Sequence, residues 1–415
     1  MDTDLGTGGA GDRVVALPSA FSHERGRPGR EGHVGAGPDA PLSAREAIPT
    51  APSRLPSLTG LRFVAALLVF AGHVLWFTRL VPGEIGTALK LAFSLAGPYG
   101  VGFFFVLSGF VLTWTARRED TARSFWRRRL AKIGPTHLVA YGLAALLSAG
   151  SARPASAVDR LASLTLQQAW FPNLRTALAV NEVGWSLSCE FFFYLVFPAL
   201  LPPLRRLPAR WLWPAAAVVT VLIAGAFLVA RFLVPDQPRL TLFSMTAPVS
   251  FDQVWFAYFF PPVRALEFVL GILLARIVTA GRWPRIGLLP ALAMAAVGYP
   301  LGLCEPYLAG RGGLASVCTA PLIAAAAVAD LRARPSVFRL RTMVFLGEIS
   351  FAFYMVHLTV IMTAAHLIGP VRTFSPVTGV GLVLVLFAVS LGCSLLLHRY
   401  VETPVTRRFG RHRPG

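Results

Sequence analysis

Two ionisable side chains lie in the first long apolar stretch of the chain. Arg62 and His73 are eleven residues apart within Leu58–Phe77, which is otherwise almost wholly apolar. Ionisable groups are costly in lipid, and those found there usually serve a function. At about 1.5 Å of rise per residue, His73 would lie roughly 16 Å beyond Arg62 along one helix. A neutral imidazole at such a position could accept a proton from a hydroxyl group.

Three later apolar segments also carry ionisable side chains. Glu190 has no partner within its own segment, so it must pair with another segment or stay protonated. Arg264 and Glu267 are three residues apart, which places them on one helical face, and we favour a structural ion pair. For His357, a hydrogen bond to a neighbouring helix and a functional role are equally good interpretations.

The composition indicates a membrane protein with many spans. Hydrophobic residues make up 55% of the chain and charged residues only 14%, and apolar runs long enough to cross a bilayer recur along it. We therefore predict an all-α fold with about ten transmembrane helices and both termini in the cytoplasm. The predicted spans lie at about 59–79, 98–116, 136–150, 184–201, 211–233, 262–280, 285–303, 312–331, 344–367 and 377–398.

The distribution of Arg and Lys supports this count of spans. With both termini inside, the inner connections hold about twice as many basic residues as the longer outer loops, as the positive-inside rule requires. The net charge of +19 then reflects contact with an anionic inner leaflet, so a lipid bilayer is the expected partner and nucleic acid is not. The densest basic cluster is a topology signal first and a phosphate-binding candidate second, and it contains Arg127, Arg128, Arg129 and Lys132.

The chain divides into three predicted regions. Residues 1–57 are rich in Gly, Pro, Ala and Arg without apolar periodicity, which predicts a disordered cytoplasmic leader. Residues 58–400 form the transmembrane domain, and residues 401–415 form a basic cytoplasmic tail. The four cysteines are scattered singly, so we expect no metal site and no disulfide framework.

Several motifs resemble those of one enzyme family. Arg62, ten residues and then His73, preceded by Leu58-Thr59-Gly60-Leu61, are similar to the first-span motif of the acyltransferase family 3 integral membrane proteins. The resemblance covers roughly residues 55 to 405 in the family's order, so chance is a poor explanation although each motif alone is weak. The later matching segments are Gly100–Phe110, Arg127–Pro135, Trp185–Glu190 with Phe197-Pro198, Pro262–Gly271, Leu346–His357 and Glu402–Pro404.

The resemblance implies transfer of an acyl group from cytoplasmic acyl-CoA, a co-substrate rather than a bound cofactor, to a hydroxyl group. His73 would act as the general base, and Glu190 would orient it if their helices meet. Arg62 would bind the CoA phosphates, with the basic cluster of residues 127–132 as secondary candidates. The other expected binding residues are Ser108, Trp185, Arg264, Glu267 and His357.

The acceptor stays open at this stage. A bias towards Ala, Arg and Pro suggests a high-GC genome and favours a polyketide or macrolide hydroxyl, as in antibiotic biosynthesis. O-acetylation of a cell-surface or exported glycan is the alternative, and both acceptors are compatible with an enzyme in the cell membrane. A transporter or flippase would also place ionisable groups in mid-membrane, but no internal repeat links residues 59–233 with residues 262–398.

Overall fold

The computed structural model describes residues 54–78, 80–117, 119–147, 155–242, 245–304, 307–311, 313–369 and 374–409. The leader predicted for residues 1–57 therefore lies outside the described residues except for its last four, and so does the end of the predicted tail from residue 410 on. Both regions stay predictions.

Long helices make up most of the described chain, and every predicted span coincides with one of them. Seven helical segments of the described residues are long and apolar enough to cross a membrane, which makes this a mainly helical membrane protein. Ten crossings and cytoplasmic termini stay predictions, because α10 carries three charged residues and α11 and α13 are shorter. The long helices are α1 (Pro56–Phe77), α3 (Ala96–Thr115), α4 (Ala122–Leu147), α7 (Gly184–Arg206), α8 (Leu212–Leu233), α10 (Pro261–Thr279), α11 (Leu288–Cys304), α13 (Leu314–Leu331), α14 (Arg341–Ile368) and α15 (Pro376–Leu397).

Short elements connect these helices. The one departure from an all-α fold among the described residues is an antiparallel hairpin of β1 (Arg239–Leu242) and β2 (Met245–Ser250). It follows α8, in a connection that was not assigned to any span. The other short elements are α2 (Gly83–Ala92), α5 (Ala157–Leu164), η2 (Gln168–Trp170), α6 (Leu174–Ala177), η3 (Ala209–Trp211), α9 (Phe251–Val254), η4 (Trp255–Phe259), α12 (Tyr307–Arg311), η5 (Val337–Arg339), η6 (His398–Glu402) and α16 (Thr403–Phe409).

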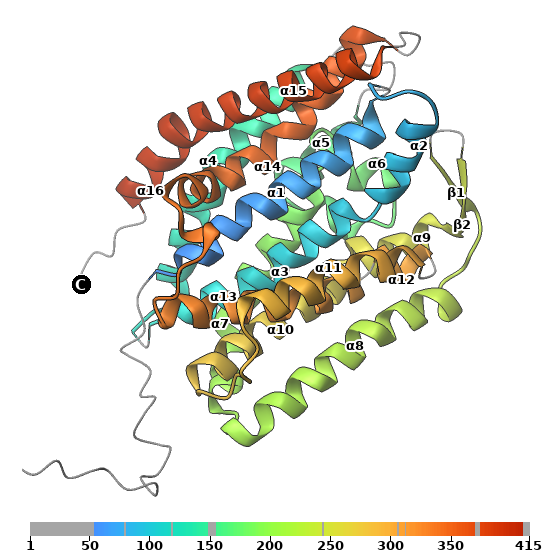
Figure 1. The fold of residues 1–415 in the computed structure, drawn as a ribbon. Coiled ribbons are helices and arrows are strands. Elements are labelled where there is room, and N and C mark those ends of the chain that lie inside the picture. The colour runs from blue at the N-terminus through green and yellow to red at the C-terminus, as the bar shows by residue number, and fades with distance from the viewer. Residues whose placement is uncertain are drawn as a thin grey trace, which may run out of the picture. The chain divides into compact units, whose positions relative to one another are not determined.

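Helix α1 packs mainly against α14 and α3 (Figure 1). Its close approach to α14 requires glycine at position 347, because a β-carbon there would overlap the carbonyl oxygen of Thr59. The first turn of α1 has no side-chain cap of its own. Instead, the carboxylate of Asp330 on α13 accepts hydrogen bonds from the backbone N–H and hydroxyl of Ser57, at 2.8 and 2.7 Å, which satisfies an otherwise unpaired helix N-terminus. These contacts hold the register of the helix that carries Arg62 and His73.

Helices α8 and α15 lie at opposite edges of the helical bundle (Figure 1). Both expose large apolar side chains, including Val221 and Phe232 on α8 and Val377 and Leu384 on α15. Exposed apolar surface of this extent is unfavourable in water, and hydrocarbon would cover it. This arrangement is what a bilayer-embedded protein requires.

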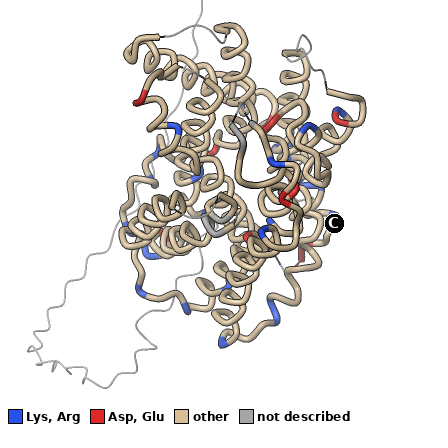
Figure 2. Tube along the Cα trace, turned by 90° about the vertical axis from the view of Figure 1, so that its right-hand side faces the viewer, with Lys and Arg blue, Asp and Glu red and all other residues tan. Residues whose placement is uncertain are grey.

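Basic residues gather at one end of the helices. The connections at 205–212, 280–287 and 332–341 contain arginines and no Asp or Glu. Figure 2 shows the same asymmetry, because the loops along its lower margin carry Lys and Arg only. Two of these connections, where α8 begins and α10 ends, lie at the lower end of Figure 1 as well. By the positive-inside rule this end would face the cytoplasm, and the orientation of the chain in the membrane stays a prediction.

Helix α4 is longer than the span predicted at residues 136–150. It begins at Ala122 and continues through Pro135 to Leu147, so the basic cluster forms its first turns rather than a loop. A proline inside a helix removes one backbone hydrogen bond and is tolerated in membrane helices where neighbouring groups compensate. Because the cluster is helical, its members point in different directions, and only some of them reach the interior.

Candidate active site

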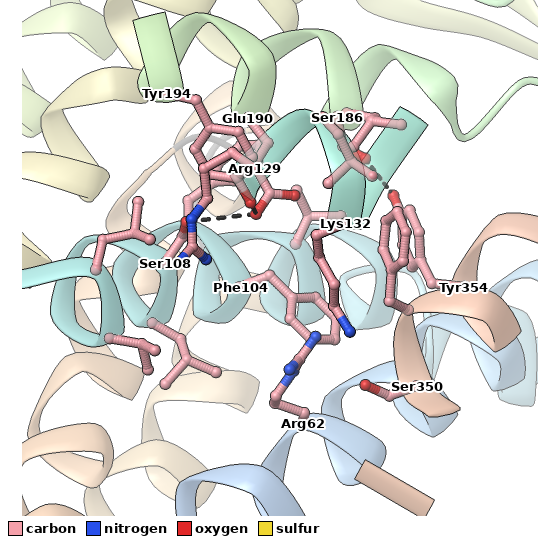
Figure 3. A pocket seen from close by; sticks show the side chains of 18 of the residues that line it. Arg62, Phe104, Ser108, Arg129, Lys132, Ser186, Glu190, Tyr194, Ser350 and Tyr354 are labelled. Carbon is pink, nitrogen blue, oxygen red and sulfur yellow. Dashed lines mark hydrogen bonds between the residues drawn. The ribbon is translucent and has the colours of Figure 1, made fainter. Parts of the chain in front are cut away.

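A cavity of about 150 Å³ lies among helices α1, α3, α4, α7 and α14. Figure 3 shows that polar and charged side chains of these helices point into it between aromatic and aliphatic ones. The polar lining residues are Arg62, Ser108, Arg129, Lys132, Ser186, Glu190, Tyr194, Ser350 and Tyr354, and the apolar ones include Val101, Phe104, Phe105, Leu112 and Met355. Five of the residues expected at a binding or catalytic site, Arg62, Ser108, Arg129, Lys132 and Glu190, are thus brought together from four helices.

The three cations of this cavity differ in how they are held. Within the described chain, Arg62 forms neither a hydrogen bond nor an ion pair. The Nε of Arg129 is buried and has no hydrogen-bond partner among the described residues, although its guanidinium lies 5.5 Å from the centre of the Phe125 ring. Lys132 is ion-paired with the buried carboxylate of Glu402. Two of the three cations therefore have donors available for an anionic ligand.

Glu190 pairs with groups of the cavity and not with the imidazole of His73. Its carboxylate accepts hydrogen bonds from the hydroxyl of Ser108 at 3.4 Å and from that of Tyr194 at 2.5 Å. The contact expected between Glu190 and His73 is not formed, because the ring of His73 bonds to His357 on α14 instead. A catalytic role for Glu190 stays a prediction, and in this arrangement it would act within the cavity.

A second, more polar cavity of about 230 Å³ adjoins the first and shares Leu112 and Arg129 with it. Its other lining residues come from the end of α3, the following connection and the start of α4, and they include Arg117, Asp120 and Arg128. Arg128 is ion-paired with Asp120 at 2.7 Å. Arg127, which was expected to bind the donor, is exposed and lines neither cavity.

His73 and His357 form a pair beyond the lining of the main cavity. Nδ1 of His73 lies 2.8 Å from Nε2 of His357, and the two ring planes are 6° apart. The ring of Tyr354, which lines the cavity, lies 5.7 Å from the ring of His357, centre to centre. One layer of aromatic side chains thus separates the histidine pair from the cavity.

One face of α3 lines the main cavity and also extends to the histidine pair. Val101, Phe104 and Ser108 line the cavity at spacings of three and four residues, which is one stripe of an α-helix. Gly97 is the next position of this stripe, and a β-carbon built there would lie 3.9 Å from Nε2 of His73. The free side of the His73 ring therefore faces the continuation of the cavity wall, one helical turn, or about 5.4 Å, further along.

Three expected binding residues lie outside the lining of the main cavity. Arg264 and Glu267 form an ion pair of 3.0 Å that is 1% exposed, and they border a separate cavity of about 10 Å³. The Arg264 guanidinium also lies 5.0 Å from the centre of the Phe105 ring. Trp185 packs against Tyr258 at 4.7 Å and does not line the main cavity. The ion pair expected between Arg264 and Glu267 is formed, and a role of these three residues in donor binding stays a prediction.

Several cavity residues were not predicted. Tyr194 lies one turn after Glu190 on α7, and the spacing of four residues could have identified it as a partner of the carboxylate. Tyr354 lies three residues before His357. Its hydroxyl is 2.7 Å from that of Ser186, a contact between two helices that no local spacing indicates.

The chain also matches a known protein family. Residues 55–399 match the family described as "Acyltransferase domain", which is acyltransferase family 3. The chain belongs to acyltransferase family 3. No solved structure matches the chain significantly, so the arrangement of the acyltransferase cavity is argued from its own residues.

Relatives of this acyltransferase carry several names. "Acyltransferase MdmB" of Streptomyces mycarofaciens is 40% identical over 371 residues, which cover 87% of this chain and 94% of that protein. "Exopolysaccharide production protein ExoZ" of Rhizobium meliloti is 28% identical, over 76% of this chain and 92% of that protein. "O-acetyltransferase OatA" of Staphylococcus aureus is 21% identical, and the match covers 86% of this chain but 58% of that longer protein.

Glu182, in the turn that leads into α7, is expected to make the stability of the acyltransferase depend on pH. Burial raises the pKa of this carboxyl from 4.5 to about 7. The folded chain therefore binds a proton that the unfolded chain has lost, and stability should fall as pH rises from about 4.5 to 7. Each unit of pKa is worth about 1.4 kcal/mol, so the loss should be on the order of 3–4 kcal/mol.

Unfolding temperatures in detergent at pH 5 and pH 8 test this expectation. Glu182→Gln should remove most of the pH dependence and raise the midpoint at pH 8. Glu84→Gln is a matched control, because Glu84 lies on the exposed face of α2. An equal pH dependence of the wild type and Glu182→Gln would contradict the expectation.

Proposed function

We propose that this acyltransferase transfers an acyl group from acyl-CoA to a hydroxyl group of a polyketide or macrolide. The observation that carries the proposal is the gathering of Arg62, Arg129 and Lys132 in one cavity, on whose α3 wall the next position, Gly97, adjoins His73. CoA is a polyanion with a long, flexible thioester arm, and it needs cations at one end and an apolar passage at the other. Membership of an acyltransferase family favours this function over a transporter or flippase.

The donor would enter from the basic end of the helices. In the proposal, Arg117 and Arg128 of the second cavity receive the nucleotide phosphates, since guanidinium groups bind phosphate oxygens in pairs. Arg129 belongs to both cavities and would mark the point where the arm turns inward. The donors of Arg62 and the carboxylate of Glu190 would then hold polar groups of the arm.

The thioester would pass the contact between Phe104 and Tyr354 to reach His73. Their ring centres are 6.0 Å apart, in an edge-to-face arrangement. Rotation of aromatic side chains of this kind is a small change compared with movement of a helix. We propose that donor binding displaces this contact and joins the cavity to the space beside Gly97.

The reaction then follows from the position of His73. The acceptor oxygen attacks the thioester carbonyl carbon while Nε2 of His73 takes the hydroxyl proton. A carbon–oxygen bond forms, the carbon–sulfur bond breaks, and the proton passes from the imidazolium to the departing sulfur. The products are an ester and CoA with a free thiol, and no oxidant or further reactant is needed.

The choice of acceptor rests on the comparisons and on composition. Similarity to MdmB is greater and extends over more of both chains than similarity to OatA. A glycan hydroxyl is the second candidate, because the exopolysaccharide production protein ExoZ matches over 92% of its length. We place the protein in the cell membrane, with its basic end in the cytoplasm.

An assay of the purified full-length protein in detergent tests the proposal. Acetyl-CoA, propionyl-CoA and butyryl-CoA would each be incubated with a panel of macrolides and a panel of oligosaccharides. Free CoA thiol is measured together with the mass gain of the acceptor. Acyl transfer to a macrolide supports the proposal, and transfer to oligosaccharides alone favours the glycan alternative. Absence of transfer to every acceptor, with no thiol release above a heat-inactivated sample, would refute it.

A further inference from the structure

In the histidine pair, the neighbouring groups determine which ring nitrogens donate and which accept hydrogen bonds. Nδ1 of the fully buried His357 lies 2.7 Å from the carbonyl oxygen of Tyr354 and 3.2 Å from that of Phe353. A carbonyl oxygen only accepts, so Nδ1 of His357 must carry the proton. A neutral imidazole has one N–H, which leaves Nε2 of His357 as an acceptor.

The tautomer of His73 follows from that of His357. Nε2 of His357 is 2.8 Å from Nδ1 of His73, and as an acceptor it requires a proton on that Nδ1. The two rings are within 6° of parallel and their centres are 5.1 Å apart, which suits a hydrogen bond directed in the plane of both rings. Neutral His73 is therefore left with a lone pair on Nε2, the nitrogen that faces Gly97.

The backbone that starts this chain of hydrogen bonds is itself held in place. The side-chain amide of Asn181, which precedes α7, donates to the carbonyl of Met355 at 3.0 Å. The ring of Phe353 lies 5.8 Å from that of His357 at an angle of 9°. Both contacts limit movement of the helical turn that presents the Tyr354 carbonyl to His357.

We infer that His357 is a positioning residue, which keeps His73 in the tautomer whose Nε2 can accept the proton of the acceptor hydroxyl. Both nitrogens of His357 are engaged, so it is not itself available as the base. When His73 takes a proton on Nε2, its Nδ1–H continues to donate to His357, and the imidazolium is formed without rearrangement of the pair. This inference rests on the proposed function for its catalytic consequence, whereas the tautomer follows from the geometry alone.

Two substitutions separate positioning from mere packing. His357→Leu fills a similar space but removes the acceptor, so kcat for acyl transfer should fall about 10- to 100-fold, by analogy with the loss of the hydrogen-bond partner of a metal-bound histidine. The KM for acyl-CoA should change less than about twofold, because His357 does not line either cavity. His357→Gln supplies an oxygen for the Nδ1–H of His73 and an amide for the Tyr354 carbonyl, and it should restore most of kcat.

Nitrogen NMR of the protein labelled with ¹⁵N-histidine reads the tautomer directly. The His73 signals are assigned by their loss in His73→Ala, and His366→Leu, at an exposed position of α14, is the control for labelling and folding. In the wild type and His357→Gln, Nδ1 of His73 should carry the proton. In His357→Leu, a population protonated on Nε2 should appear.

The outcomes have distinct meanings. A wild-type His73 that is protonated on Nε2 overturns the inference whether or not acyl transfer is detected. An unchanged kcat in His357→Leu, or a kcat in His357→Gln as low as in His357→Leu, overturns the positioning role. Absence of acyl transfer by the wild type would refute the proposed function instead, and the spectrum would still decide the tautomer, so the two failures can be told apart. If His357→Leu does not fold, the wild-type spectrum and the kcat of His357→Gln remain as tests.

Discussion

Acyl transfer by the His73→Ala variant is expected to be about 10²- to 10⁴-fold slower in kcat than that of the wild type, because the variant lacks the group that takes the hydroxyl proton. The imidazole is partly buried, and within the described part of the chain its hydrogen bond is to His357 on α14. The neighbouring stripe of α3, at positions 97, 101, 104 and 108, carries no ionisable side chain that could replace it. The KM for the donor should stay within a few-fold of the wild-type value, since His73 does not line the cavities.

Initial rates of CoA thiol release with a saturating acceptor measure this effect. His366→Ala is the matched control, because it removes an exposed histidine from a helix of the same bundle. Both variants should elute as the wild type does in size-exclusion chromatography. Turnover by His73→Ala within threefold of the wild type would show that the base lies elsewhere.

Arg62→Ala is expected to raise the KM for acyl-CoA about 10- to 100-fold. Arg62 lines the main cavity and has no hydrogen bond or ion pair within the described part of the chain, so its donors are free for the acyl donor. A hydrogen bond to a charged group is worth about 1.5–3 kcal/mol, and about 1.4 kcal/mol corresponds to a tenfold change in affinity. Arg62→Lys keeps the charge but loses the paired donors, and it should lie between the wild type and Arg62→Ala.

Arg127→Ala provides the comparison that makes this result specific. Arg127 has the same charge and also lies on a helix of the basic end, but it is exposed and lines neither cavity. Its removal should leave the KM for acyl-CoA within about twofold, in line with the small effect of an exposed charge screened by salt. Titrations of acyl-CoA at fixed acceptor, at two salt concentrations, measure both variants. Equal KM values for Arg62→Ala and the wild type would contradict the proposed donor contact.

Because the main cavity is separated from His73, substrate binding must open a path between them. Arg62 and His73 lie on one continuous helix, and eleven residues make about three turns, so they share a face. The cavity reaches Arg62, whereas the histidine pair lies behind Tyr354. Enzymes commonly complete their catalytic arrangement only when the correct substrate displaces such a barrier. A barrier at this point would also keep water from the thioester until the acceptor is bound.

Much of the fold could be predicted from local sequence. Each of the ten apolar segments coincides with a helix, because burial of apolar side chains in lipid and satisfaction of backbone hydrogen bonds depend on composition over about 20 consecutive residues. A shared donor-binding role was expected for Arg62, Arg129 and Lys132, since motifs of one family were matched in order, whereas Glu190 was expected beside His73 and not in the cavity with them. The helical start of α4 was not expected, because charge density indicated a loop there.

The amino-acid sequence by itself determined which side chains share a helical face, and therefore that Arg62 and His73 are three turns apart and that Arg264 can pair with Glu267. Only the tertiary structure decided that His73 meets His357, 284 positions away, and that Glu190 is satisfied by Ser108 and Tyr194. The physical reason is that helix periodicity is a property of neighbours in the chain. The rotation of one helix against another is set by packing over the whole bundle, through close approaches such as that of Gly347 to Thr59.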